Sequence, residues 1–240
     1  MVIVDSHYLH SMCTLYANTK GRELVRNLFR VSDNRAAAFD PRNAILPSEM
    51  APVVRVAEEG ERELVNLTWG FMRREADRAP RRVVNTRDDQ VRGNPFWRDS
   101  FLTRRCLVPA TSYSEPQGTK PATWHWFTIN GDEERPLFAF PGLWAPYRGP
   151  LKKNGEDVEQ TVFSIMTTVP NELTASINHE RMPVLLTSEA EWHTWLTGTP
   201  AEAFALLRPY PESAMRHVGS GLERRDAGTN EGPAQQTLLL

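Results

Sequence analysis

Short runs of apolar residues, many of them alternating with polar ones, predict strands along most of this chain. The runs are rich in β-branched and aromatic side chains and are bounded by turn-forming residues. The predicted strands are residues 52–56, 63–69, 106–109, 123–129, 136–144, 161–168 and 182–187. Turns rather than regular helices separate them. This favours an α+β fold or a partly closed antiparallel barrel over a doubly wound parallel sheet.

Helical periodicity is confined to a few short segments. Residues 19–30 place four apolar side chains on one face, namely Leu24, Val25, Leu28 and Phe29. Asn94 and Pro95 predict the capped start of a short helix. Two later helices carry capping-box signatures, Ser188 with Glu191 and Thr199 with Glu202. The helices are therefore expected to be short and peripheral.

Three stretches show neither the alternation expected of a strand nor the periodicity expected of a helix. Residues 39–52 are punctuated by proline and predict irregular structure. Residues 149–160 form a polar insertion between two strands. Residues 219–240 are rich in glycine and charge and predict a disordered tail. The expected organisation is an extension over 1–12, one domain over 13–218 and the tail over 219–240.

Composition excludes several classes of protein. The chain has 240 residues, 40% of them hydrophobic and 24% charged, which is ordinary for a soluble domain with one core. No apolar run reaches the roughly 20 residues of a membrane span, and the first residues lack the features of a secretory signal. Two cysteines without a CxxC pair, and six histidines without ligand-like spacing, predict no disulfide, metal or cofactor. A cytoplasmic, nucleoid-associated location is expected.

Arginine is concentrated in one segment although the net charge is only −2. Residues 73–105 contain ten arginines and five acids, a local excess of +5. Arginine is suited to bidentate phosphate contacts. A solvated loop with internal ion pairs is the alternative interpretation.

Met12 and Cys13 carry the most specific chemistry. If translation starts at Met12 and that methionine is removed, Cys13 becomes the amino terminus. Its amine and thiol then lie on adjacent carbons, and this pair can capture an aldehyde through nitrogen and then through sulfur. An internal cysteine cannot do this, because its nitrogen is an amide.

Other candidate residues have weaker individual signals. His179 is a possible general acid or base, although a lone histidine is more often structural. Glu115 follows a predicted strand in a turn-like context, where glutamate is usually solvated. Asn85 offers a hydrogen-bond donor and an acceptor, and the guanidinium of Arg87 can bind a phosphate through two hydrogen bonds. Trp69 could stack on a base or belong to the core. Cys106 is expected to be a buried small hydrophobe.

The order of these residues resembles the SOS response-associated peptidase (SRAP) family, also called abasic-site processing proteins. The matching pieces are Met12-Cys13, Trp69-Gly70, the Asn85-x-Arg87 motif, and the longer blocks RRCLVPATSYSE and IMTTVPNELTASINHERMPVLL. The resemblance covers 12–218. It implies a single barrel-like domain, acting as a monomer, that binds single-stranded DNA in a basic cleft and links covalently to abasic sites in the DNA damage response.

The resemblance also implies roles for individual residues. Cys13 matches the nucleophile, and Asn85, Glu115 and His179 match the other catalytic residues. Three further residues match positions that contact DNA: Arg87, Trp69 and Pro47. Cys13 is followed by Thr14-Leu15 where many members have Gly-Arg, and Glu115 by Pro116 where many have an aromatic residue.

The expected product is a thiazolidine formed by Cys13 and the open-chain aldehyde of an abasic deoxyribose. This requires that residues 1–12 be absent or removed. A mis-assigned start codon is the preferred explanation, and residues added for expression or self-cleavage before Cys13 are the others. A cysteine peptidase acting on other proteins, and a non-covalent module for single-stranded DNA, stay open as alternative functions.

Overall fold

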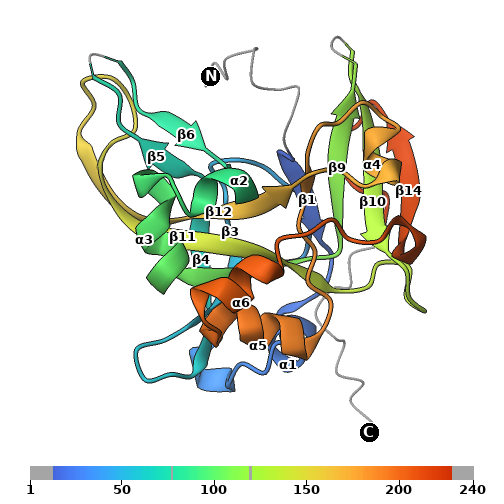
Figure 1. Cartoon of the computed structure of the whole chain (residues 1–240), viewed down its shortest axis with the longest axis horizontal. Helices are drawn as coiled ribbons and strands as arrows, with labels where there is room; N and C mark the ends of the chain where they lie inside the picture. The colour runs from blue at the N-terminus through green and yellow to red at the C-terminus, as the bar shows by residue number, and fades with distance from the viewer. Residues whose placement is uncertain (1–12, 77, 119–120, 229–240) are drawn as a thin grey trace, which may run out of the picture.

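The computed structural model describes residues 13–76, 78–118 and 121–228. Within them the chain forms two large sheets with short helices around them, as the strand-rich pattern predicts (Figure 1). The α+β prediction is therefore confirmed. No helix among the described residues is long and apolar enough to cross a bilayer.

One sheet closes on itself as a five-stranded barrel. Its strands are β3 (Met50–Val56), β4 (Arg62–Trp69), β8 (Arg105–Ala110), β11 (Phe138–Pro150) and β12 (Asp157–Thr168). Neighbours pair in the order β11-β8-β3-β4-β12, and a pairing of β12 with β11 completes the ring. The β4–β12 pair is parallel, whereas the other pairs of the ring are antiparallel. Full closure leaves the barrel without an edge.

Two short strands extend the barrel beside β12. They are β7 (Asn85–Arg87), which pairs with β12 in parallel, and β13 (Met182–Pro183), which pairs with it antiparallel. Both carry residues of the sequence motifs into the middle of the molecule. β12 is thus the strand that brings the Asn-x-Arg motif and the His179 segment together.

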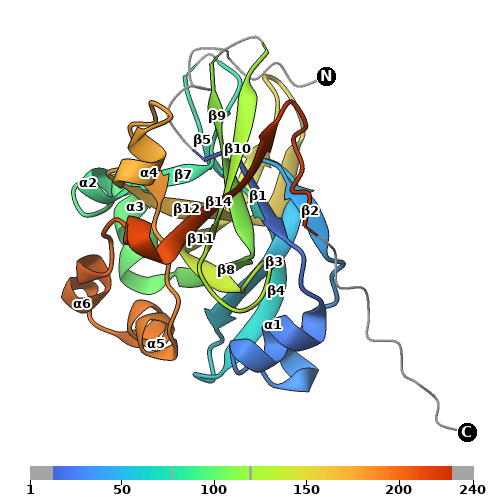
Figure 2. The ribbon, with the colours of Figure 1, turned by 90° about the vertical axis from the view of Figure 1, so that its right-hand side faces the viewer.

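The second sheet is antiparallel, in the order β14-β10-β9-β1-β2, and lies on the side that faces the viewer in Figure 2. Its strands are β1 (Leu15–Asn18), β2 (Arg42–Ile45), β9 (Ser112–Gln117), β10 (Thr123–Ile129) and β14 (Met215–Gly221). Tyr16, Tyr113 and Phe127 on its inner face share one hydrophobic core with the barrel. Trp124 and Trp126 on its outer face form a smaller cluster with Leu15 and Ala17.

The helices are short and lie outside the sheets. They are α1 (Arg22–Leu28), α2 (Asp88–Val91), α3 (Pro95–Thr103), α4 (Glu172–Ala175), α5 (Glu189–Thr197), α6 (Pro200–Ala205), and the 3₁₀ turns η1 (Asp33–Arg35) and η2 (Glu212–Ala214). The Asn94 cap and both predicted capping boxes are present. The buried Trp195 of α5 donates its indole N–H to the carbonyl of Cys106, 2.8 Å away, which fixes α5 on β8. Cys106 is buried, as predicted.

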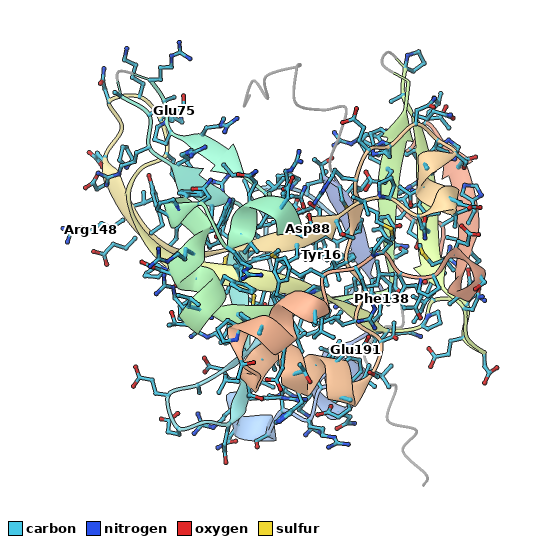
Figure 3. The ribbon with its side chains drawn as sticks, viewed as in Figure 1. Tyr16, Glu75, Asp88, Phe138, Arg148 and Glu191 are labelled. Atoms are coloured by element: carbon cyan, nitrogen blue, oxygen red, sulfur yellow. The ribbon has the colours of Figure 1, made fainter. Side chains whose placement is uncertain are left out.

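A small hairpin of β5 (Phe71–Arg73) and β6 (Arg81–Val83) follows β4. Gly70, between β4 and β5, has φ +114°, and a Cβ there would lie 2.4 Å from Cγ of Arg82. Glycine is therefore required at this bend. Figure 3 places Glu75 of this hairpin and Arg148 of β11 at the same outer end of the molecule, where Arg74 donates a hydrogen bond to the carbonyl of Arg148.

Several predicted boundaries are wrong. Residues 39–52 are not irregular, because β2 and the start of β3 lie there. The strand predicted over 182–187 is reduced to β13 and one isolated bridge at Leu186. The helix predicted over 19–30 is shortened to α1, and Leu24 and Leu28 are exposed rather than buried.

The polar segments are also more ordered than their composition predicts. β11 and β12 extend into 149–160 and leave only 151–156 as the turn. β14 continues to Gly221, and Asp226 is buried, so residues 219–228 do not form a disordered tail. Backbone pairing can extend strands regardless of side-chain polarity, which explains the first error. Residues 1–12 and 229–240 lie outside the described residues.

Candidate active site

Cys13 is buried where the start of β1 meets the strands beside β12. Its exposed fraction is 1%, and its Sγ lies 3.6 Å from the carbonyl oxygen of Leu15. Asn85, at the start of β7, donates from Nδ2 to the carbonyl oxygen of Cys13 at 2.6 Å. The Cys13 backbone is therefore held by a side chain 72 residues away in sequence.

Glu115 and His179 form a second pair in the same buried region. Nδ1 of His179 lies 3.3 Å from Oε2 of Glu115, and the two side chains are 2% and 0% exposed. Glu115 belongs to β9 and its side chain is enclosed by protein, so the expected turn-like context is wrong, and the alternative of a merely solvated glutamate does not apply. The error arose because a strand of serine, tyrosine and proline residues carries little apolar signal.

Protons in this pair can be assigned from the hydrogen bonds. Nε2 of His179 lies 2.7 Å from the carbonyl oxygen of Pro116, which only accepts, so Nε2 carries a proton. In the neutral imidazole, Nδ1 then carries the lone pair, 3.3 Å from Oε2 of Glu115. One further proton placed between Nδ1 and Oε2 makes either a carboxylic acid beside imidazole or a carboxylate beside imidazolium.

Burial sets the charge of the site. It raises the pKa of the Glu115 carboxyl well above its ordinary value, because the carboxylate loses its hydration. Burial also raises the pKa of the Cys13 thiol, and the nearby Glu115 raises it further. Both groups are therefore held in their protonated, neutral forms over a wider pH range than in water. The thiol is not a preformed thiolate.

Two buried acceptors in the site receive no hydrogen bond from the residues that the structure describes. They are Oδ1 of Asn85 and Oε1 of Glu115, whereas Oε2 of Glu115 lies beside Nδ1 of His179. Unsatisfied buried polar atoms cost free energy and are rare in folded proteins. Their gathering around Cys13 points to a site built to bind polar groups of another molecule.

The loop that carries His179 is anchored by its neighbour Arg181. The guanidinium donates to Asp88 Oδ1 at 2.5 Å and to the carbonyl of Thr167 at 2.6 Å. Thr168 donates to the other oxygen of Asp88 at 2.7 Å. Asp88 begins α2 and lies near the centre of the view in Figure 3. Arg181 thereby positions His179 relative to β7 and β12.

Arg87 lies two residues after Asn85, and its side chain is half exposed. It makes a bidentate ion pair with Asp89, with distances of 3.0 and 2.6 Å. The neighbouring Glu180 contributes to the raised pKa of Arg87, after the larger effects of Asp89 and Asp88. Arg87 is therefore near the His179 loop but outside the buried site.

Trp69 cannot stack on a base in this structure. Its exposed fraction is 0%, and its ring packs edge-on against Tyr16 and parallel to Phe163. Its indole N–H donates to the carbonyl of Val84, the residue before Asn85, at 2.9 Å. The expected role of Trp69 at DNA stays a prediction, and the ring as placed here belongs to the core. Trp69 instead supports the start of β7 from within the core.

Pro47 lies in the turn between β2 and β3 and is partly exposed. The next residue, Ser48, has φ +74°, and its amide donates to the carbonyl of Trp69 at 2.9 Å. The structure therefore places Pro47 at the surface beside the end of β4.

Much of the arginine excess over 73–105 serves the fold. Arg82 donates to the carbonyls of Trp69 and Gly70, and Arg105 donates to those of Phe101, Trp195 and Gly198. These guanidinium groups are hydrogen-bonded to backbone carbonyls at bends of the chain. The charge of the segment thus overstates how much of it is available to phosphate.

Comparisons with known proteins agree with the sequence blocks. Residues 12–220 match the family described as SOS response associated peptidase (SRAP). This chain belongs to the SRAP family. It is 30% identical over 182 residues to the abasic site processing protein YoqW of Bacillus subtilis (strain 168), which covers 74% of this chain and 77% of that protein. It is 27% identical over 195 residues to YoaM, an abasic site processing protein of the same organism, over 74% and 76% of the two chains.

Solved structures share the SRAP fold at lower identity. A crystal structure from Bordetella bronchiseptica matches with a TM-score of 0.67 at 22% identity, over 85% of this chain and 98% of that one. A crystal structure from Bacteroides thetaiotaomicron matches with a TM-score of 0.65 at 21% identity, over 85% and 90%. These likenesses establish the fold.

Sequence reasoning missed two parts of this SRAP site. The Asp88–Arg181 anchor was not anticipated, although Arg181 stands in the quoted His179 block. Tyr113, two residues before Glu115, is fully buried with its hydroxyl 3.4 Å from Oγ1 of Thr174. Burial raises the pKa of Tyr113, and the nearby Glu115 and Cys13 raise it further. The sequence could have predicted this position, because residues two apart on a strand lie on the same face and Tyr113 is two residues before Glu115.

Proposed function

We propose that this SRAP protein captures abasic sites in single-stranded DNA through a covalent bond to Cys13, after Cys13 has become the first residue. The observation that carries the proposal is the burial of Cys13 beside Asn85 and the Glu115–His179 pair. The relatives named abasic site processing proteins support the choice of substrate.

The first bond forms between the α-amine of Cys13 and C1′ of the ring-opened deoxyribose. An α-amine has a pKa near 8, about two units below that of lysine, so a useful fraction is neutral at pH 7. The amine adds to the aldehyde, and loss of one water gives an imine. The thiol then adds to C1′ and its proton passes to the imine nitrogen, which closes the thiazolidine. The net reaction releases one water.

The surrounding residues have distinct roles in this scheme. Asn85 holds the carbonyl of Cys13, and its free Oδ1 is an acceptor for the new amine. The neutral Glu115 supplies the proton that opens the sugar and assists the departing water. His179 exchanges that proton with Glu115 across the 3.3 Å contact. The raised pKa of the Cys13 thiol keeps it protonated until the imine has formed.

DNA would reach the site past Arg87, which is exposed, and Pro47, which is partly exposed. Arg87 would exchange its pair with Asp89 for a backbone phosphate, because its planar fork suits either anion. A solvent-exposed ion pair contributes only about 0–1 kcal/mol, so the exchange is inexpensive. We propose that a monomer is sufficient for capture.

Residues 1–12 must be absent for this chemistry. A start at Met12 with removal of that methionine would provide the free amine. Self-cleavage before Cys13, in keeping with the family description, is the other route that we propose to test. Intact mass of the protein purified from its native host, without an added tag, distinguishes these cases.

The decisive experiment compares three versions of the protein with an oligonucleotide that has one abasic site. Protein that begins at Cys13 should give a denaturant-resistant adduct whose mass equals protein plus DNA minus one water. Cys13→Ser, with its free amine, should give only an imine that requires borohydride for trapping. Cys13→Ala should behave like the serine variant.

Matched controls separate covalent capture from simple DNA binding. An oligonucleotide with an intact base should give no adduct, and non-covalent binding should weaken steeply with salt. An undiminished, hydrolysis-stable adduct with Cys13→Ala would refute the thiazolidine. An equally fast adduct with Met1–Met12 still attached would refute the role of the amine.

A further inference from the structure

Two histidines outside the proposed catalytic group meet on adjacent strands of the second sheet. His125 belongs to β10 and His217 to β14, and Nδ1 of His125 lies 3.3 Å from Nε2 of His217. The ring centroids are 5.3 Å apart, with the planes tilted by 44°. A shift in register between Trp126 and Phe127 brings His217 opposite Phe127, diagonal to His125. Side chains on such diagonals are within reach of one another.

The pair is next to the proposed active site and differs from it in exposure. His125 lies directly opposite Glu115 in the β9–β10 ladder, so their side chains share a face of the sheet. Glu115 is buried, whereas His125 is half-buried and His217 is exposed. The two rings therefore form a rim that solutes can reach.

Gln117 fixes which nitrogen of His125 is free. Its Oε1 lies 3.1 Å from Nε2 of His125, and an amide oxygen only accepts, so Nε2 carries the proton. The lone pair of His125 is then on Nδ1, which faces His217. An acceptor behind one ring nitrogen, with the lone pair of the other directed forward, is the arrangement found behind metal-binding histidines.

The spacing of the two nitrogens fits a shared metal ion. Zinc–imidazole bonds of about 2.0–2.1 Å at a tetrahedral angle place two ligand nitrogens about 3.3–3.4 Å apart. The observed separation of 3.3 Å falls at this value. Nε2 of His217 donates in the present hydrogen bond, so metal binding replaces that bond: the proton of His217 moves to its Nδ1, and each ring turns to direct its lone pair to the ion.

We propose that His125 and His217 bind a divalent late transition-metal ion, with water in the remaining coordination positions. Neutral imidazole suits Zn²⁺, Cu²⁺ and Ni²⁺, whereas Mg²⁺ prefers oxygen ligands. Burial, with smaller contributions from His217 and His179, lowers the pKa of His125, so the neutral, ligating form is favoured. In the described part of the chain, no three or more histidine, cysteine or acidic side chains are placed so that they could hold one metal ion together, so two protein ligands are expected.

Calorimetric titration of the full-length protein with Zn²⁺ and with Cu²⁺ tests the site. His7 and His10 should first be replaced by alanine, because they are further imidazoles outside the described residues. One ion should bind per protein, Cu²⁺ more tightly than Zn²⁺. His125→Ala and His217→Ala should each weaken binding by more than about tenfold.

Two further variants make the result specific. His193→Ala is the matched control, because His193 is an exposed histidine of α5 whose ring is hydrogen-bonded to Thr197, and this change should leave affinity unchanged. Gln117→Leu removes the acceptor behind His125 and should weaken binding by about tenfold. Circular dichroism of each variant shows whether the fold is retained.

The electron paramagnetic resonance spectrum of bound Cu²⁺ should show two coordinated nitrogens, and one or none in the single variants. Unchanged affinity in folded His125→Ala and His217→Ala would overturn the proposal and leave the pair as a hydrogen bond between strands. Absence of any binding to the folded parent would overturn it equally. These measurements use no DNA, so their outcome is independent of the proposed cross-linking function.

Discussion

Glu115 shows how strongly a single buried side chain can depend on its surroundings. Its carboxyl is enclosed by protein, and only burial is identified as the cause of its raised pKa. The carboxyl contacts His179 but no guanidinium or lysine in the described structure. A carboxyl in this setting can act as an acid near neutral pH.

Glu115→Gln should change both chemistry and stability. Because the pKa of Glu115 is higher in the folded than in the unfolded protein, the free energy of unfolding should decrease as the pH rises from the unfolded pKa of about 4.5 to the folded pKa. Glutamine does not titrate, so the Glu115→Gln variant should not show this decrease. It should also form the adduct about 10²–10⁴-fold more slowly.

Urea unfolding between pH 5 and pH 9 and single-turnover cross-linking measure the two effects. Glu63→Gln is a suitable control, because Glu63 pairs with Arg55 at 2.6 Å on the barrel, away from Cys13 in sequence and fold. A glutamine variant at 115 with the same pH dependence as the parent would contradict the assigned burial effect.

At the level of elements, the sequence predicted helix starts best, because there a side chain forms a hydrogen bond with a backbone amide of the same turn. The Ser188–Glu191 and Thr199–Glu202 boxes form as predicted because both partners lie within one turn. Strand ends were predicted less well, since they depend on which partner strand is present. β2 pairs with β1, and β14 with β10, across long separations in sequence.

Ser188→Ala should destabilise the protein by about 1 kcal/mol, because the amide of Glu191 loses its capping acceptor. Thermal or urea unfolding measures this change. Glu191→Gln is the control, because a glutamine oxygen can still accept from the amide of Ser188 and only the exposed ion pair with Arg208 is lost, at less than about 1 kcal/mol. A Ser188→Ala variant that is no less stable than the parent would contradict the capping contribution.

At the scale of the whole molecule, the segment after β14 connects distant parts of the chain. Asp226 is buried and receives hydrogen bonds from Arg135 at 2.7 and 2.6 Å and from Ser112. Its backbone exchanges hydrogen bonds with Asn43 of β2. One residue thus joins the C-terminal segment to β9, β2 and the loop before β11.

Asp226→Asn should cost about 3–5 kcal/mol, because it removes the buried carboxylate that pairs with Arg135 and leaves only the longer contact with the exposed Glu134 as counter-charge. Burial raises the pKa of Asp226, but the hydrogen bonds from Arg135 and Ser112 outweigh it and hold the pKa below its usual range. The contribution of the pair is therefore present above about pH 3.8 and is lost as pH falls through the lower, folded pKa.

Chemical denaturation at pH 7 and pH 3 measures this effect. Glu223→Gln removes an exposed pair with Arg225 and should change stability by less than about 1 kcal/mol. Replacing both buried partners, Arg135→Met with Asp226→Leu, should be less costly than Asp226→Asn alone. A double variant as unstable as the single one would contradict the unpaired-charge explanation.

The sequence by itself determined the strand-rich class, the helix caps and the order of the Cys13, Asn85, Glu115 and His179 motifs. These depend on side-chain chemistry and on contacts within a few residues. It also placed the four residues in one proposed site through resemblance, and the structure brings them together.

Only the tertiary structure decided which side chains are buried and which strands are neighbours. Glu115 lies inside rather than in a solvated turn, Trp69 is enclosed in the core, and Asp226 is buried rather than in a disordered tail. His125 and His217 are 92 residues apart, so no spacing rule could pair them. Burial and strand pairing are properties of the assembled sheets, because each depends on partners that are distant in sequence.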